Sequence, residues 1–133
     1  MKVNPHRSSL GMDANTLALL SYVAAFVLSW VPIIKYVAWA APLVLFFVEK
    51  QSPFVKFHAM QAFLLEVVSW VITIVFSVLL FWMPFNGLLA AILNVLLTIL
   101  AIVALVKAGG YEEYKIPVIG DIADKIRRSN MPI

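Results

Sequence analysis

Four long apolar runs, at about residues 15–31, 33–48, 57–82 and 88–106, fill most of the 133-residue chain. Hydrophobic residues make up 63% of the sequence and charged residues only 13%, whereas a soluble domain has roughly 45–50% and 25%. A chain this short cannot bury that excess inside a globular core, because small domains leave much of their surface exposed. The pattern predicts an all-α, polytopic membrane protein with four transmembrane helices arranged as two hairpins.

The second run is the least regular of the four, since it carries Lys35 near its start and Pro42 in its middle. As a helix it would be ~24 Å long, which is short of a hydrocarbon core of ~30 Å. Lys35 can extend its ammonium group to the near interface, and local thinning of the bilayer can absorb the remaining difference. We expect a full span here, with a re-entrant hairpin as the alternative.

Lysine and arginine residues fall almost entirely on one side of this four-helix topology. Nine of the ten lie in the N-terminal segment, the second loop or the C-terminal tail, and Lys35 alone lies on the other side. Because cytoplasmic loops carry the excess of basic residues, this distribution predicts a cell (inner) membrane protein with both termini in the cytoplasm. The net charge of +3 is therefore interpreted as membrane orientation, and we expect no nucleic-acid partner.

The chain divides into a polar N-terminal segment at residues 1–12, a membrane domain at 13–107 and a cytoplasmic tail at 108–133. In the tail, apolar residues recur at helical spacing and charged residues fill the other side, which predicts a short interfacial amphipathic helix with its basic side chains near anionic lipid. The alternative is a solvated tail that only ends the last span. The apolar positions are Ile119, Ile122, Ala123 and Ile126.

A few polar side chains are expected at membrane depth in the third and fourth helices. Ionisable groups are costly inside a bilayer, so they usually face a helix bundle or a cavity. At about 100° per residue, the polar residues of the third helix share one side, opposite a face of Val, Ile, Leu and Phe. The candidate functional or structural positions are His58, Gln61, Glu66, Ser69 and Thr73 in the third helix and Asn94 and Thr98 in the fourth.

For most of these positions we favour a structural interpretation. The four hydroxyl and amide side chains beyond Glu66 fit interhelical hydrogen bonds, each worth about 0.6–2 kcal/mol. His58 fits a hydrogen bond to a neighbouring helix or loop better than a proton relay. For Glu66, a functional carboxylate and a buried structural one agree equally well with the sequence.

The sequence offers little for catalysis or cofactor binding. It has no cysteine and two histidines, and it has no Gly-rich phosphate loop, which excludes thiol chemistry and makes a metal cage unconvincing. A nucleophile and a base do not share one depth, because Ser69 and His58 would lie ~16 Å apart along the helix. We therefore expect no enzymatic activity, no metal site and no cofactor.

Two segments carry a resemblance to a known family. Residues 53–63, Pro-Phe-Val-Lys-Phe-His-Ala-Met-Gln-Ala-Phe, resemble the start of a membrane helix in small bacterial and archaeal membrane proteins. Those proteins are related to the twenty-kilodalton inner-envelope subunit of the chloroplast import translocon, the Tic-type import component. Residues 114–123, Tyr-Lys-Ile-Pro-Val-Ile-Gly-Asp-Ile-Ala, are similar to that family's tail. The resemblance implies a four-span membrane protein and, for plastid members, a role in protein translocation.

The two motifs are expected to meet on the cytoplasmic side. In the first, Phe54 and Phe57 are suited to anchor at the acyl boundary, and Lys56 is suited to face lipid phosphates. His58 and Gln61 lie one turn apart and can hydrogen-bond the tail or a neighbouring loop. The residues that mark the tail motif are Tyr114, Pro117 and Gly120.

The favoured function is a non-enzymatic interaction or assembly module of the membrane. An oligomeric channel or protein-translocation component is the alternative, and a small-solute or ion transporter is the second alternative. The expected partners are membrane lipids together with further copies of the chain or other membrane proteins.

Overall fold

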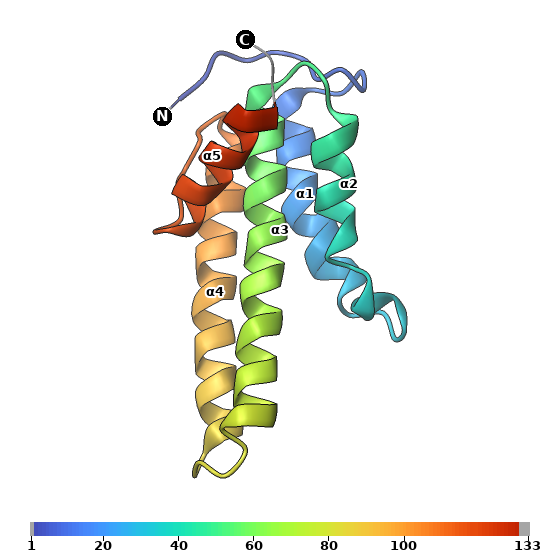
Figure 1. The fold of residues 1–133 in the computed structure, drawn as a ribbon. Coiled ribbons are helices and arrows are strands. Elements are labelled where there is room, and N and C mark those ends of the chain that lie inside the picture. The colour runs from blue at the N-terminus through green and yellow to red at the C-terminus, as the bar shows by residue number, and fades with distance from the viewer. Residues whose placement is uncertain (1, 131–133) are drawn as a thin grey trace.

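The computed structural model describes residues 2–130 of the chain. The predicted N-terminal and tail segments extend beyond this range, at residue 1 and residues 131–133. Within the described range the all-α class is confirmed, and β-pairing is limited to two isolated bridges. The elements in chain order are α1 (Ala14–Leu28), the 3₁₀ turn η1 (Ile34–Tyr36), α2 (Ala40–Val48), α3 (Pro53–Ile74), the π-helical turn η2 (Val75–Leu79), α4 (Asn86–Gly109) and α5 (Ile119–Asn130) (Figure 1).

The long hairpin consists of α3, its continuation η2, and α4. Ser52 caps α3 by accepting a hydrogen bond from the Val55 amide at 3.2 Å, and Pro53 occupies the first turn, where its missing amide hydrogen costs nothing. The stretch Pro53–Leu79 has 27 residues and α4 has 24, so they extend ~40 Å and ~36 Å. Both are long and apolar enough to cross a membrane.

The prediction of four transmembrane helices is wrong in number, because within residues 2–130 only α3 with η2 and α4 meet that length. The first predicted span, 15–31, becomes the 15-residue α1, and the second, 33–48, keeps only the nine-residue α2. These two helices reach about 22 Å and 14 Å. Together they form a short hairpin beside one half of the long one (Figure 1).

The short hairpin ends early for local reasons. Pro32 cannot donate the next helical hydrogen bond, and Ile33 adopts a left-handed φ of 73° that reverses the chain. Pro42 lies in the first turn of α2, where no amide donor is needed, so the helix begins just before this residue and is not kinked by it. The residues in between form loop and a single 3₁₀ turn instead of membrane helix.

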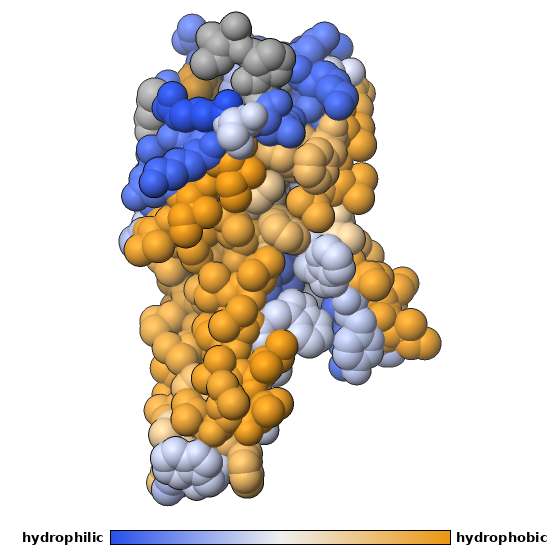
Figure 2. All heavy atoms as spheres, in the orientation of Figure 1, coloured by the Kyte–Doolittle hydropathy of each residue, from blue (hydrophilic) through white to orange (hydrophobic). Residues whose placement is uncertain are grey.

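The packed core lies at one end of the molecule. There α1 packs between α3 and α4, while α2 and α5 both pack on α3. Figure 2 shows this end as a hydrophilic cap above a hydrophobic shaft. Along the shaft, residues of α3 and α4 expose large apolar side chains, including Val71, Ile74, Val95 and Ile102.

Candidate functional site

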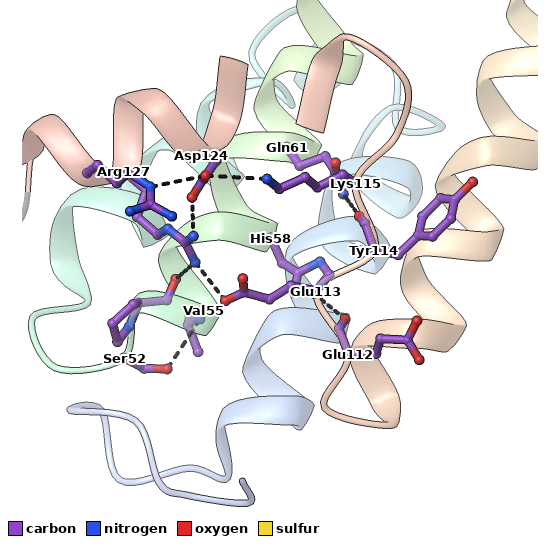
Figure 3. A network of polar contacts seen from close by, with 12 residues as sticks. Ser52, Val55, His58, Gln61, Glu112, Glu113, Tyr114, Lys115, Asp124 and Arg127 are labelled. Carbon is purple, nitrogen blue, oxygen red and sulfur yellow. Dashed lines mark hydrogen bonds and ion pairs between the residues drawn. The ribbon is translucent and has the colours of Figure 1, made fainter. Parts of the chain in front are cut away.

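The polar head is the hydrophilic end of the molecule, made of residues 2–13, the loop 49–52, the first turns of α3 and the tail 111–130. Gln61 of α3 is fully buried in it and uses both ends of its amide. Its Nε2 donates to the hydroxyl of Tyr22 at 2.8 Å and to the carbonyl of Tyr114 at 3.0 Å, and its Oε1 accepts from the amide of Ile116 at 2.9 Å. One side chain of α3 therefore binds α1 and the tail together. Figure 3 shows Gln61 beside the tail residue Tyr114.

His58 lies one turn before Gln61 and joins the same elements. Its Nε2 lies 3.0 Å from the carbonyl oxygen of Glu112, and its Nδ1 lies 2.7 Å from the hydroxyl of Tyr22. A carbonyl only accepts, so Nε2 carries the proton and Nδ1 accepts from Tyr22. Because the Tyr22 oxygen also accepts from Gln61, the three side chains form one buried chain of hydrogen bonds. The expected packing of the helix-start motif against the tail motif is thus present.

Gly120 allows the tail to approach this closely. A Cβ at this position would lie 2.5 Å from the Cα and Cβ of Lys115 and 2.9 Å from Oε1 of Gln61. No side chain fits there without a backbone shift. Gly120 of the tail motif is therefore part of the contact with Gln61. Tyr114 contributes the carbonyl that accepts a hydrogen bond from Gln61. Pro117 is exposed and starts the turn into α5.

A second network holds α5 on α3 through buried charges. The guanidinium of Arg127 donates to Glu113 at 2.6 Å, to the carbonyl of Pro53 at 3.2 Å, and to Asp124 (Figure 3). Asp124 also pairs with Arg128 at 3.1 Å and with Lys115 at 3.4 Å. Burial alone would raise the pKa of Asp124, but these hydrogen bonds and positive charges outweigh it and hold the pKa below its usual value.

Three motif residues occupy places other than those predicted. Lys56 does not face lipid phosphates. Its ammonium group donates to the carbonyl of Phe46 at 2.9 Å and to Asn130 at 2.5 Å, which ties the end of α2 to the end of α5. Phe54 and Phe57 do not anchor at the acyl boundary, since they are 1% and 0% exposed and pack in the core of the head. Both corrections have one cause: the tail covers the start of α3.

Glu49 fixes the loop between α2 and α3, and it was not among the residues selected from the sequence. Its carboxylate accepts hydrogen bonds from the amides of Ser9, Gln51 and Ser52 at 2.8–3.2 Å. Burial acts to raise the pKa of Glu49, but the three amide donors outweigh burial and lower it. A carboxylate three residues before the Ser-Pro helix start was the available signal.

The remaining candidates lie further along α3 and α4, away from the head. Ser69 donates to Oδ1 of Asn94 at 2.5 Å, which links the two helices. Thr73 and Thr98 each donate to the carbonyl four residues earlier in their own helix. Glu66 lies in a small cavity between α1, α3 and α4. The predicted polar side of the third helix is thus divided in two. His58 and Gln61 belong to the polar head, whereas Glu66, Ser69 and Thr73 lie further along the helix.

Several residues of these networks were missed because their partners are far apart in the sequence. Tyr22 lies in an apolar run where it is indistinguishable from a membrane aromatic residue. Glu113, Asp124 and Arg127 read as ordinary charges of a polar tail. Only the fold brings Arg127 to the start of α3, 74 residues away.

Comparison with known proteins gives a consistent group of matches. The model of the magnetosome magnetite crystal formation protein family (MamF/MmsF) matches residues 13–123. A UPF0132 membrane protein of Methanocaldococcus jannaschii is 34% identical over 119 residues, which is 90% of this chain and 93% of the relative. A second one from the same organism is 32% identical over 121 residues, covering 90% and 74%. No solved structure matches the chain.

These matches correct the resemblance drawn from residues 53–63 and 114–123. The family model and the relatives are not Tic-type import components, so the resemblance is wrong and the link to protein translocation that it implied has no support. The physical reason lies in what the two motifs do. They dock a tail onto a membrane helix, and this packing carries no information about a transported cargo.

Proposed function

The chain belongs to the magnetosome magnetite crystal formation protein family, and we propose that it serves as a non-enzymatic interaction and assembly module of the membrane. Its similar relatives are named membrane proteins. The family's name refers to magnetite crystals. Within residues 2–130, no group of three or more His, Cys, Asp or Glu side chains gathers where it could hold a metal ion.

The observation that carries the proposal is how the polar head uses its polar groups. His58 and Gln61 are fully buried, and each makes its hydrogen bonds to Tyr22 and to the tail backbone. Arg127 is paired with carboxylates on the same side of the molecule. Because these side chains use their polar groups for hydrogen bonds and ion pairs within the protein, they hold the surface in one shape and do not present a reactive group to a substrate. A fixed surface at the membrane boundary suits binding to another protein.

The aromatic hollow is a second part of the proposed binding surface. It has a volume of about 440 Å³ and lies between the tip of the short hairpin and α3 (Figure 2). Tyr36 and Trp39 line it from the short hairpin, and Phe63, Val67 and Trp70 line it from α3. Large aromatic side chains are enriched where proteins bind one another. The hollow therefore suits a membrane helix of a neighbouring protein.

We further propose that the long hairpin crosses the bilayer and that the short hairpin enters only one leaflet. A hydrocarbon core of ~30 Å needs about 20 helical residues, which corresponds to Met60–Leu79 on α3 and η2. The ring of Tyr36 lies 6.2 Å from that of Trp70, and Trp70 is close to the middle of this stretch. The ammonium group of Lys35, at this tip, lies 5.2 Å from the centroid of the Tyr36 ring, a cation–π contact that offsets part of the cost of a charge in the membrane.

We also propose that both termini lie in the cytoplasm. The N-terminal segment and the tail lie at one end of the molecule, joined by a hydrogen bond from the Val3 amide to the Tyr111 carbonyl at 2.8 Å. Nine of the ten basic residues belong to segments at this end or to the first turns of α3. The positive-inside rule supports a cytoplasmic head whether the short hairpin spans or re-enters.

The topology can be tested directly because the chain has no cysteine. Single cysteines would replace Lys35, Phe85 and Lys125, and intact cells would be treated with a membrane-impermeant maleimide. We expect labelling at position 85 from outside the cell, at 125 only after the membrane is opened, and none at 35 from outside. Labelling of position 35 from outside at the rate of position 85 would refute the one-leaflet hairpin.

The assembly role is tested by the mass of the particle extracted in native lipid without denaturing detergent. We expect the chain together with further copies or with a second membrane protein. Gln61→Leu should loosen the head and reduce this assembly, while Gln51→Leu, at an exposed position, should not. A single copy with no other protein would contradict the proposal. Conductance of the purified chain in liposomes would instead favour the oligomeric channel.

A further inference from the structure

Glu66 is a half-buried carboxylate at membrane depth that the polar head does not use. It lies ten residues after Lys56, ~15 Å further along α3. Within residues 2–130 its side chain forms no hydrogen bond or ion pair. A lone negative charge at this depth is costly, because no protein cation within residues 2–130 compensates it.

The carboxylate of Glu66 shares its cavity with other oxygen atoms. The cavity has a volume of about 100 Å³ and lies where α1, α3 and α4 meet. Ser69, Asn94 and Thr98 line it together with Glu66, and Tyr22 lies at its wall. The other lining residues are Ala25, Phe26, Ala62, Leu65, Leu97 and Ala101.

The hydrogen-bond directions leave these oxygens with lone pairs to offer. The hydroxyl hydrogen of Ser69 points to Asn94, and that of Thr98 points to a backbone carbonyl. Each hydroxyl oxygen therefore keeps acceptor capacity, as does the Asn94 amide oxygen. Tyr22 differs, because its hydroxyl is already bonded to His58 and Gln61. The cavity thus presents one carboxylate and three neutral oxygens, and the hydroxyl hydrogens of Ser69, Thr98 and Tyr22 are already engaged.

We propose that this cavity binds a monovalent alkali cation, with Glu66 as the charged ligand and Ser69, Asn94 and Thr98 as neutral ligands. Oxygen atoms of carboxylates, amides and hydroxyls suit hard cations. A single positive charge neutralises Glu66, whereas a divalent ion would leave one uncompensated charge in the bilayer. A water molecule occupies about 30 Å³ in the liquid, so the cavity has room for one ion and a few waters. The site is separate from the proposed assembly surface and does not depend on it.

The test uses the full chain in lipid nanodiscs and dicyclohexylcarbodiimide, which reacts with protonated carboxyl groups in apolar surroundings. Modification of Glu66 is followed by mass spectrometry at one pH and ionic strength in sodium, lithium, potassium or N-methylglucamine chloride. A bound cation keeps the carboxylate unprotonated. We expect at least one alkali cation to slow the reaction about tenfold when present at ten times its Kd. Equal rates in all four salts would overturn the proposal and show that Glu66 takes a proton only.

Two threonines provide a matched pair of variants. Thr98→Val removes a proposed ligand, whereas Thr73→Val removes the same type of hydroxyl-to-carbonyl hydrogen bond outside the cavity. We expect Thr98→Val to raise the cation concentration for half-protection by about tenfold and Thr73→Val to leave it unchanged. Equal shifts in the two variants would overturn the ligand assignment.

A second measurement covers the case in which the reagent does not reach Glu66. The thermal unfolding midpoint is compared between alkali chloride and N-methylglucamine chloride for the native chain and for Glu66→Gln. A cation that binds only the folded chain should raise the midpoint by about 5 °C or more at a hundredfold excess over Kd. Glu66→Gln should lose this dependence. A midpoint that is the same in every salt, or an equal rise in both chains, would overturn the site.

Discussion

Replacing Gln61 by leucine should release the tail from the membrane helices. The change keeps most of the side-chain volume but leaves the Ile116 amide and the Tyr114 carbonyl without their partners and removes one donor from the Tyr22 hydroxyl. An unsatisfied buried group costs about 1–3 kcal/mol. The three losses share one site and are not additive, so we expect the docking free energy of the tail to fall by about 3 kcal/mol.

The opening can be measured with a cysteine placed at Ala123. This residue is fully buried against α3 in the docked tail. Its side chain is a methyl group, so replacing it removes none of the hydrogen bonds of Gln61. In the docked state a maleimide reaches the thiol only when α5 lifts away, so the labelling rate follows the population of the open tail. A loss of about 3 kcal/mol corresponds to roughly a hundredfold faster labelling.

The control is Gln51→Leu in the same cysteine background, because Gln51 is exposed and its side chain forms no hydrogen bond within residues 2–130. Its labelling rate should match that of the unaltered chain. If Gln61→Leu and Gln51→Leu label at the same rate, the buried amide does not hold the tail and the reasoning about the head is refuted.

Three further predictions use the same labelling assay or an unfolding measurement. Gly120→Ala should speed labelling, because the new Cβ would come within 2.5 Å of Lys115 backbone and force the turn apart; an unchanged rate would show that the turn can yield. Asn94→Leu should lower the thermal midpoint by a few degrees, since it removes the link to Ser69, worth about 1 kcal/mol; a midpoint equal to that of the native chain would count against this link. Asp124 has its pKa held below its usual value of 3.8 when the tail is docked, so its contribution to docking is complete above that pH and is lost as the pH falls below it. Labelling relative to that of an exposed cysteine at the same pH should therefore rise on acidification in the native chain and not in Asp124→Asn, and a rise that persists in that variant would assign the effect to another group.

The elements that could be predicted are those fixed by local sequence. The apolar runs of the second half of the chain gave the long hairpin, and Ser52-Pro53 marks the start of α3 by its capping chemistry. The contact of His58 and Gln61 with the tail also followed, because two polar side chains one turn apart at a helix start need partners on the same side of the membrane.

Three features were not predicted, because hydropathy does not distinguish contact with lipid from contact with protein and does not report backbone turns or the folding back of the tail. Lipid tails and a protein core are equally apolar, so Phe54 and Phe57 look the same whether they anchor in lipid or pack under α5. The shortened second run depends on the left-handed turn at Ile33, a residue type that rarely adopts it. The ion pairs of Arg127 depend on where the tail folds back, which no local pattern encodes.

The unequal depth of the two hairpins gives the protein a different footprint in each leaflet. An α-helix with its side chains is about 10–12 Å across, so it takes up roughly 80–110 Å² of membrane area. With the hairpins placed as proposed above, the head-side leaflet accommodates four helices and the far leaflet only α3 and α4. The excess is about 160–220 Å² for each copy. Clustered copies would therefore crowd one monolayer and favour bilayers that are convex on the side of the head.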